Sequence, residues 1–229
     1  MPSHARTDGG TAAAPLLIFP CNGNAIEALD CLGEAWRLVA FVDDTPGKQG
    51  TSRFGHPVRG REALREHADA RVLAVPGSPR SFRRRRDAIE SLGLPRERYA
   101  CVVHPSARVS PLASVGSDVL LMAGVVVTAN AVIGDHVCIL PNTVVHHDAT
   151  IGDWTLVGSN VSIAGGARLG ANCYVGSGSR LIDGVEIGDR ALVGLGSTVI
   201  RSVPVDAVVA GNPARRLVSH PGQSNAVAS

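Results

Sequence analysis

Two adjacent histidines and an aspartate, His146, His147 and Asp148, interrupt a run of aliphatic and small residues in the stretch VVHHDATIGD. Imidazole has an ordinary pKa of about 6.5, so a neutral ring can remove a proton from a nucleophile near neutral pH. A neighbouring carboxylate can fix the tautomer of the ring and stabilise the imidazolium that forms. The three side chains could therefore serve as a general base and its orienting group, provided that the surrounding elements hold them together.

Those elements follow a strict six-residue period that starts at residue 103. An aliphatic residue opens each of eighteen consecutive hexads, from Val103 to Val205, and a small or β-branched residue stands four positions later. Glycine also recurs every eighteen residues, so three hexads make one structural turn. These glycines are Gly116, Gly134, Gly152, Gly170 and Gly188.

A period of this kind is typical of a parallel β-helix, in which each coil buries its aliphatic residues by stacking on the next. Residues 103–210 are predicted to form about six coils. The first and fifth positions of a hexad point inward, and the positions between them form corners. In the hexad that opens at Val145, His146, His147 and Asp148 are corner residues, which places them outside the core where a ligand can meet them. The period alone leaves the handedness open.

Residues 15–102 follow another pattern, in which short apolar runs alternate with amphipathic segments. Buried strands are predicted at 16–19, 38–42, 72–75 and 99–103. Helices are predicted in NAIEALDCLGEA, REALREHA and RSFRRRRDAIESLG. This alternation implies a parallel sheet with right-handed crossovers, hence a small Rossmann-like α/β domain. The arginine run 83–86 is expected to be a solvated helix face.

The composition restricts the partners and the compartment. The chain has 22 basic and 20 acidic residues, a net charge of +2 and only 3% aromatic residues, a balance that argues against nucleic acid or a membrane surface. Five cysteines without a CxxC pair favour the cytoplasm over a disulfide framework or a zinc site. Residues 1–14 lack the apolar region of a signal peptide and are expected to be a disordered tail; residues 211–229 form a C-terminal segment and tail.

The hexads, preceded by HPSARV and followed by VVAGNPARRL, resemble those of the left-handed β-helix acyltransferases. Together with the α/β domain, they are similar to bacterial nucleotide-sugar acetyltransferases and sialic-acid O-acetyltransferases over about residues 16–217. The resemblance implies a homotrimer that transfers acetyl from acetyl-CoA to an amino group of a nucleotide-linked amino-deoxysugar, with no metal. Sugar O-acetylation is the alternative within the family.

The resemblance also assigns roles around the two histidines. It makes His147 the base and Asp148 its orienting carboxylate, whereas His146 stands where the family carries an acidic residue and is a candidate substrate contact. Asn142 lies five residues before His147, closer than in many relatives, and is a second candidate substrate contact. His104 and His136 are expected to be structural.

Acetyl-CoA in similar enzymes lies along the β-helix wall at a subunit interface, with its amides paired to main-chain groups. By this resemblance the amide of Gly165 is placed to bind the thioester oxygen. Ser177 and Leu195 are placed near the pantetheine arm. Arg215 and Arg216 are candidates for the CoA phosphates, although a solvated basic segment is an equally good interpretation of that pair.

The first domain is expected to hold the nucleotide. Asn22, Gly23 and Asn24 lie at a strand-to-helix junction where the family carries a glycine-rich loop, and such a junction offers backbone amides and a positive helix end to a phosphate. Asp43 and Asp44 match an acidic pair near the nucleotide in the family, although an ordinary acidic turn explains them equally well. The absence of GxGxxG argues against a dinucleotide dehydrogenase.

Two other functions are compatible with a β-helix. A carbonic anhydrase of the γ type needs three histidines that converge on a metal, and the spacing of His136, His146 and His147 does not fit that arrangement. The other is a non-catalytic β-helix that acts as a scaffold or binds a sugar. The HHD corner and the GNPA motif favour the enzyme.

Overall fold

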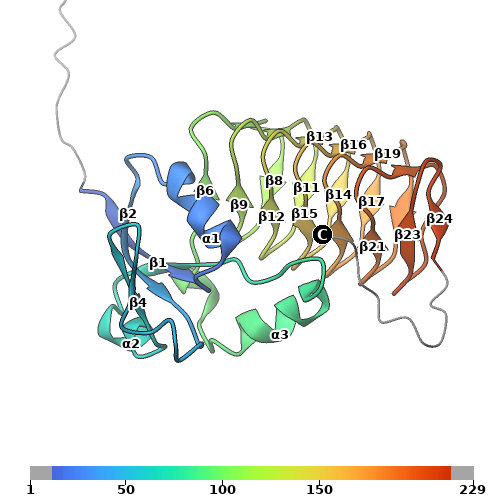
Figure 1. Cartoon of the computed structure of the whole chain (residues 1–229). Helices are drawn as coiled ribbons and strands as arrows, with labels where there is room; N and C mark the ends of the chain where they lie inside the picture. The colour runs from blue at the N-terminus through green and yellow to red at the C-terminus, as the bar shows by residue number, and fades with distance from the viewer. Residues whose placement is uncertain (1–11, 218–229) are drawn as a thin grey trace, which may run out of the picture.

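The computed structural model describes residues 12–217, which form a small α/β domain followed by a long prism of stacked coils (Figure 1). Most of the two expected tails lies outside the described residues. Within them, strand β1 already begins at Ala14, and the last strand includes Arg215 and Arg216. Among the helices of residues 12–217, none is long and apolar enough to cross a membrane.

The first domain is built on a five-stranded sheet of order β3-β4-β2-β1-β5. Its strands are β1 (Ala14–Phe19), β2 (Trp36–Val42), β3 (Ser52–Arg53), β4 (His56–Arg59) and β5 (Arg71–Ala74). All pairs are parallel except the hairpin of β3 and β4, which the sequence analysis missed. The Rossmann-like sheet is confirmed.

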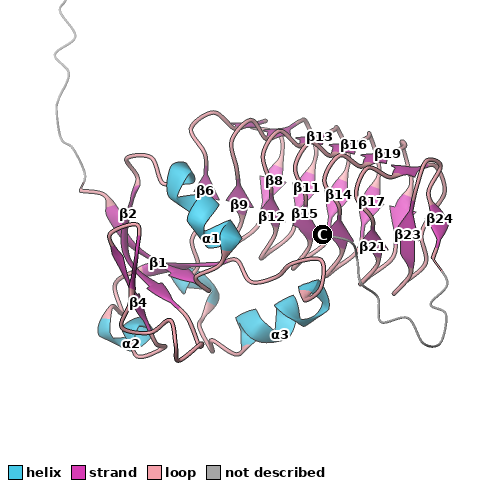
Figure 2. Cartoon of the chain, in the orientation of Figure 1, coloured by secondary structure: helices cyan, strands magenta, loops and turns pink. Residues whose placement is uncertain are grey.

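The helices are shorter than the amphipathic segments that predicted them, and all lie in the first domain (Figure 2). They are α1 (Gly23–Glu27), η1 (Ala28–Cys31), α2 (Ala63–Glu66), η2 (Phe82–Arg84), α3 (Arg85–Glu90) and η3 (Arg96–Arg98). The strand expected at 99–103 is wrong, because this segment is the crossover between domains. Tyr99 makes an isolated bridge to Val72, whereas Val102 and Val103 pair with the first full coil of the β-helix.

The β-helix is a triangular prism with three parallel sheets, here called faces I, II and III. Face I contains β6 (Val102–Val103), β9 (Leu120–Leu121), β12 (Cys138–Ile139), β15 (Leu156–Val157), β18 (Tyr174–Val175), β21 (Leu192–Val193), β23 (Val208–Ala210) and the antiparallel β24 (Arg215–Arg216). Face II contains β7 (Arg108–Val109), β10 (Val126–Val127), β13 (Val144–Val145), β16 (Ser162–Ile163), β19 (Arg180–Leu181) and β22 (Thr198–Val199). Face III contains β8 (Ser114–Val115), β11 (Val132–Ile133), β14 (Thr150–Ile151), β17 (Arg168–Leu169) and β20 (Glu186–Ile187).

Each strand pairs with the strand eighteen residues away, so equivalent residues of successive coils lie one above another. Val126, for example, pairs with Val144, and Val144 with Ser162. The second residue of each strand points inward, and the stacked aliphatic side chains form one continuous core along the prism. The coils therefore stabilise one another by burying a shared apolar column that no single coil could bury.

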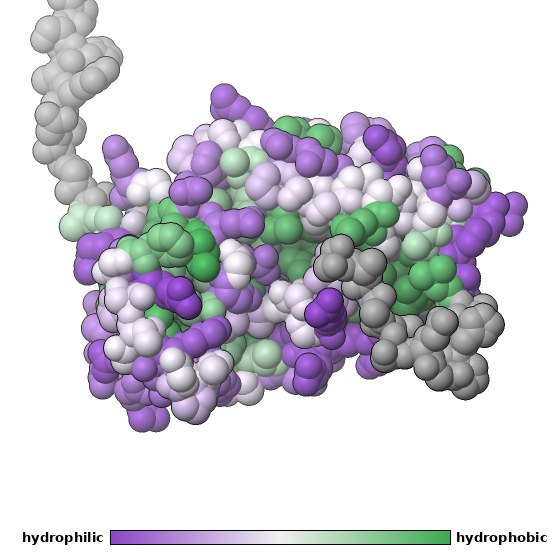
Figure 3. Space-filling view, in the orientation of Figure 1, coloured by the Kyte–Doolittle hydropathy of each residue, from purple (hydrophilic) through white to green (hydrophobic). Residues whose placement is uncertain are grey.

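The first domain covers the outside of face I. The outward column of that face is apolar, and Leu120, Cys138, Leu156, Tyr174 and Leu192 belong to the same core cluster as residues of α1, η1 and η2. Phe82 packs against Tyr174 with ring centroids 5.8 Å apart. Apolar surface gathers over α1 and in the hollow where the domain meets the coils (Figure 3). The edge between faces II and III is therefore the edge opposite the first domain.

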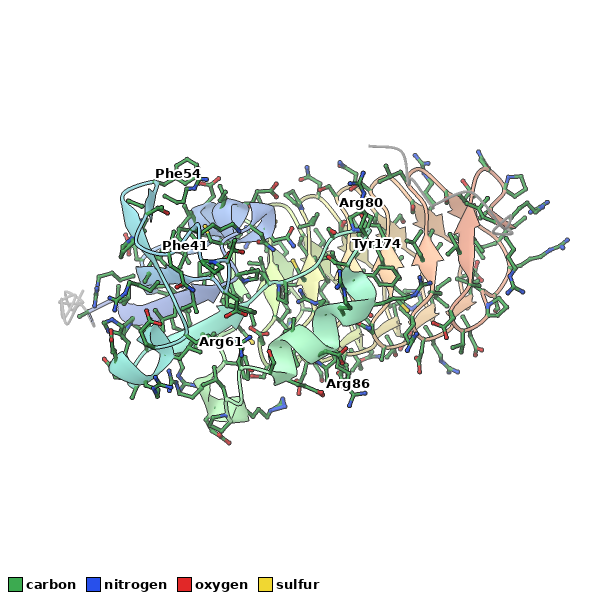
Figure 4. All side chains as sticks on the ribbon, turned by 60° about the horizontal axis from the view of Figure 1, so that its bottom comes forward. Phe41, Phe54, Arg61, Arg80, Arg86 and Tyr174 are labelled. Atoms are coloured by element: carbon green, nitrogen blue, oxygen red, sulfur yellow. The ribbon has the colours of Figure 1, made fainter. Side chains whose placement is uncertain are left out.

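The arginine run 83–86 was expected to be a solvated face; Arg83, Arg84 and Arg86 are exposed as expected, but Arg85 is buried between the domains. Arg85 is only 1% exposed. Arg83 donates to the carbonyl oxygens of Arg190 and Asp206 in the β-helix. The guanidinium of Arg86 stacks over the ring of Trp154. Figure 4 shows Arg86 and Tyr174 beside α3, of which Arg85 and Ile89 are buried while Arg86, Asp87 and Glu90 stay exposed.

The eighteen-residue period ends in the last coil, so the expected inward position of Val205 is wrong. Ile187 pairs with Val203, sixteen residues later, and Val193 pairs with Val209, also sixteen residues later. Val205 is 59% exposed, whereas Val203 is 5% exposed. An open pocket of about 460 Å³ lies beside the shortened coil, and Ser202, Val203, Pro204 and Val205 line it on one side.

This register can be tested by a pair of matched truncations. Val203→Ala should lower the free energy of unfolding by about 2 kcal/mol, because it removes buried methyl groups from the core. Val205→Ala should change it by less than about 0.5 kcal/mol, because the side chain is exposed. Denaturant unfolding followed by circular dichroism measures both. A larger loss for Val205→Ala would restore the unbroken eighteen-residue period.

Candidate active site

His147 and Asp148 lie on the edge between faces II and III, in the corner that joins β13 to β14. Nδ1 of His147 lies 2.7 Å from Oδ2 of Asp148. Both side chains are largely exposed, at 67% and 56%. Because the carboxylate can only accept, Nδ1 carries the proton and Nε2 is left with a free lone pair.

Asn130, which the sequence analysis did not single out, supports this pair from the preceding coil. Its Nδ2 donates to Oδ1 of Asp148 over 3.2 Å. The hydrogen bonds from His147 and then Asn130 lower the pKa of Asp148, so the carboxylate stays ionised. Asn130 precedes Asp148 by eighteen residues, and this spacing is the sequence signal that could have identified it.

Gly165 lies against the imidazole ring from the following coil. A Cβ atom at this position would stand 2.7 Å from both Cε1 and Nε2 of His147, so only glycine leaves room for the ring. The carbonyl oxygen of Gly165 accepts a hydrogen bond from Gly184. Within residues 12–217 the amide N–H of Gly165 has no acceptor. An imidazole that could accept a proton and an unused amide donor therefore stand side by side, and these are two groups that acyl transfer needs.

Of the other predicted residues of the β-helix, only His146 lies on this edge within one chain. His146 is adjacent but exposed, and its main-chain N–H donates to Ile163. Asn142, Ser177 and Leu195 lie on the edge between faces I and II, on the far side of face II. Ser177 accepts a hydrogen bond from the amide of Ser159, and Leu195 is 58% exposed.

Arg215 and Arg216 form β24 and are exposed at the end of the prism. Arg215 donates to the carbonyl oxygen of Ala214 and has no carboxylate partner in the described part of the chain. Both guanidinium groups therefore remain open to an anion.

The predicted nucleotide loop lies at the carboxyl end of β1. Oδ1 of Asn22 accepts from the amide of Ala25 and caps α1, while its Nδ2 donates to the carbonyl oxygen of Val75 over 3.0 Å. Asn24 donates to Val75 and Gly77 at 3.4 and 3.5 Å. Around Gly23 the space for a side chain is empty. The loop is thus open at Gly23 and tied at both asparagines to the loop that follows β5.

Asp43 and Asp44 already have partners inside the chain. Asp43 is 2% exposed, and its oxygens accept from the amides of Cys21 and Thr45 and from Nζ of Lys48. Burial raises the pKa of Asp43, but the hydrogen bonds from Lys48 and Thr45 outweigh burial and hold it below its usual value. Asp44 forms a bidentate pair with Arg61, with both distances 2.7 Å. Asp43 therefore holds the backbone at Cys21, the residue just before the predicted nucleotide loop.

The two remaining histidines singled out in the sequence have partners that hold them in place. His104 accepts from the amide of Ser106, and His136 bonds to the buried Asp118. Across residues 12–217, no three His, Cys, Asp or Glu side chains are grouped to hold a metal ion.

Comparison with protein families and solved structures identifies the coils. Residues 112–147 and 130–165 match the model of the bacterial transferase hexapeptide (six repeats). Residues 149–182 and 166–201 match the hexapeptide repeat of succinyl-transferase. No curated protein sequence matches the chain.

Among solved structures, the chain is similar to perosamine N-acetyltransferase from Caulobacter crescentus, crystallised with CoA and GDP-perosamine as a mutant in which asparagine replaces a histidine. The two are 31% identical over 91% of this chain and 99% of that one, with a TM-score of 0.78. The acetyltransferase domain of PglB from Neisseria gonorrhoeae, in complex with acetyl coenzyme A, is 26% identical over 90% and 100%, with a TM-score of 0.77. WeeI from Acinetobacter baumannii AYE shares the fold at 23% identity over 90% and 100%, with a TM-score of 0.76.

The hexapeptide coils and the similar acetyltransferase structures define a left-handed β-helix acyltransferase. The chain belongs to the family of sugar N-acetyltransferases that includes the perosamine enzyme. The fold and the family resemblance read from the sequence are confirmed.

The contact between Gly165 and His147 generates a direct test. Gly165→Ala should displace the ring and break its hydrogen bond to Asp148, because the new Cβ would overlap the imidazole. The turnover number should fall about 10²-fold or more with the melting temperature nearly unchanged. Steady-state kinetics and thermal unfolding measure the two effects. Gly47→Ala, which meets no atom within 4 Å, is the control, and equal activity of the two variants would contradict the packing.

Proposed function

We propose that the protein transfers an acetyl group from acetyl-CoA directly to the amino group of a nucleotide-linked amino-deoxysugar. The observation that carries this proposal is the His147–Asp148 pair beside the unused amide of Gly165. It is supported by the similarity to an enzyme that was crystallised with CoA and GDP-perosamine. The five free cysteines fit a reducing compartment, so the proposed location is the cytoplasm.

In the proposed mechanism, Asp148 holds the proton on Nδ1 of His147 and Nε2 faces the sugar amine. As the amine nitrogen attacks the thioester carbonyl carbon, Nε2 accepts one of its protons. The N–H of Gly165 donates to the carbonyl oxygen as it becomes negative. When the tetrahedral intermediate collapses, the C–S bond breaks and the imidazolium returns the proton to the CoA thiolate. The products are the N-acetyl sugar and free CoA.

The proposed assembly is a homotrimer in which two chains complete each site. This assembly is supported by the positions of the nucleotide loop and the base within one chain. The first domain covers face I, and His147 lies on the edge opposite that face. A sugar held by the first domain therefore cannot reach the base of its own chain. Exposed apolar residues on face III and the edge beside it offer a surface for partner chains. They are Leu112, Val132, Ile182 and Ile200.

The same assembly assigns places to the remaining candidates. In a trimer of prisms, the edge between faces I and II of a neighbouring chain can approach His147, which would bring Asn142, Ser177 and Leu195 to the pantetheine arm or the sugar. Arg215 and Arg216 are proposed to meet CoA phosphates, because two exposed guanidinium groups without carboxylate partners suit that anion. Asn22, Gly23 and Asn24 are proposed to bind the nucleotide through their loop, with Asp43 and Asp44 as its support.

The base assignment is tested by truncating each histidine. His147→Ala should lower kcat by roughly 10² to 10⁴, with small effects on either KM, because a positioned base acts on the reacting proton. His146→Ala should cost less, because its side chain makes no hydrogen bond in the described residues. Thiol release from acetyl-CoA with a panel of nucleotide-linked amino sugars is the measurement. A trimeric His147→Ala protein with wild-type turnover would refute the assignment, and a wild type that acetylates none of the sugars would favour a non-catalytic β-helix.

Sharing of the site between chains is tested by complementation. Gly23→Trp places a large side chain at the mouth of the nucleotide loop, at a position where a Cβ atom meets nothing within 4 Å, and His147→Ala removes the base. Each variant alone should be inactive. Mixed trimers purified through two different tags should recover about one third of the wild-type activity, because one of the three sites pairs an intact loop with an intact His147. Inactive mixed trimers would show that one chain supplies both halves.

A further inference from the structure

A buried group of charged side chains lies between the two domains, and acetyl transfer does not use it. Arg85, at the start of α3, and Asp118, in the corner between β8 and β9, are each 1% exposed. His136 lies one coil beyond Asp118 in the same edge, between faces III and I. This edge is not the one that carries His147.

Asp118 joins the β-helix to the end of β5. Its Oδ1 accepts from the amide of Ala74 over 2.7 Å, and its Oδ2 lies 2.8 Å from Nδ1 of His136. The ring of His136 stacks on Trp154 and meets the edge of Tyr99, with centroid distances of 5.9 and 5.0 Å. Burial raises the pKa of Asp118 to about 6, and the hydrogen bond from His136 and the charge of Arg85 oppose that rise.

Arg85 closes the same junction from the other side. Its guanidinium donates to the carbonyl oxygens of Ala74 and Pro76 in the first domain and, over 2.7 Å, to that of His136 in the β-helix. Residues 74–77, which end β5 and begin the next loop, are therefore fixed to one prism edge by hydrogen bonds of defined direction.

Residues 74–77 in turn hold the loop that is proposed to bind the nucleotide. The carbonyl oxygen of Val75 accepts from the side chains of Asn22 and Asn24, and that of Gly77 accepts from Asn24. The amide of Val75 donates to the carbonyl oxygen of Phe19, just before the nucleotide loop. The β-helix is thus connected to the loop through hydrogen bonds on both sides of the backbone segment 74–77.

We propose that Arg85 and Asp118 are positioning residues that set the nucleotide loop relative to the β-helix. Packing alone does not require them, because apolar residues of similar volume commonly replace buried charges of opposite sign without loss of stability. Arg85 and Asp118 instead make separate hydrogen bonds to backbone groups of the two domains. Hydrogen bonds to particular carbonyl and amide groups fix the orientation of the first domain on the β-helix. In a rigid trimer, that orientation determines how far the sugar amine lies from His147 of the partner subunit. This inference rests on the proposed function of the first domain.

The test compares two sets of contacts between the domains: those of Arg85 and Asp118, and those of the nearby Arg83. Arg85→Met with Asp118→Asn removes both buried charges together, so that neither stays behind without the opposite charge nearby. This double variant should stay trimeric and raise the KM for the nucleotide sugar about tenfold or more, with the KM for acetyl-CoA within about twofold of wild type. Arg83→Gln is the control: it breaks the contacts to Arg190 and Asp206 without touching residues 74–77, and should leave both KM values unchanged.

Hydrogen exchange followed by mass spectrometry gives a second readout that needs no substrate. Amides in residues 20–26 and 75–78 should exchange about tenfold faster in the double variant and at the wild-type rate in Arg83→Gln. If the double variant exchanges faster but the wild type acetylates no sugar, the positioning role is supported and the proposed acetyl transfer is contradicted. Unchanged exchange and an unchanged nucleotide-sugar KM in the double variant would overturn the proposal. If the double variant fails to fold, Arg85→Lys, which keeps the charge but contacts fewer carbonyls, replaces it in both measurements, with the same outcomes deciding.

Discussion

The structure depends on the stacking of one coil on the next in a fixed register. Each strand of the prism is only two or three residues long and is stable only because the neighbouring coils supply its hydrogen bonds and cover its aliphatic side chain. The register also builds the site, because it turns a separation of eighteen residues into direct contact. Asn130 meets Asp148 and Gly165 meets His147 through this relation, although neither pair is close in the sequence.

The sequence predicted those features that the period encodes. The inward column, the position of His147 on a corner and the coil count follow from residue spacing. A chain with this period can bury its aliphatic residues in one main arrangement. The register of the last coil was predicted wrongly because SVPVDAVV has valines two residues apart, so that either Val203 or Val205 could fill the inward position. Only the closure of the final turn on Ile187 distinguishes the two.

Contacts between the domains were the least predictable part. An arginine in a run of four is predicted to be solvated. Burial of Arg85 instead depends on carbonyl partners at positions 74, 76 and 136, which the local sequence does not predict. Asp43 is a similar case: its sequence position fits a nucleotide contact and an ordinary acidic turn equally well, and the fold directs its oxygens to partners inside the chain. One feature of the sequence could have predicted which face the first domain covers. The outward residues of face I, just before each inward position, are all apolar, including Leu120, Leu156 and Leu192.

The last strand has a consequence for how such prisms can aggregate. A stack of parallel strands ends in free backbone groups, and another chain could add to that end as a further coil, giving a fibre. Here β24 turns back and pairs antiparallel with β23, so the parallel template is interrupted on face I. Its two residues are both arginines, and two such ends would repel each other. End-to-end growth is thereby opposed, and association is left to the sides of the prism.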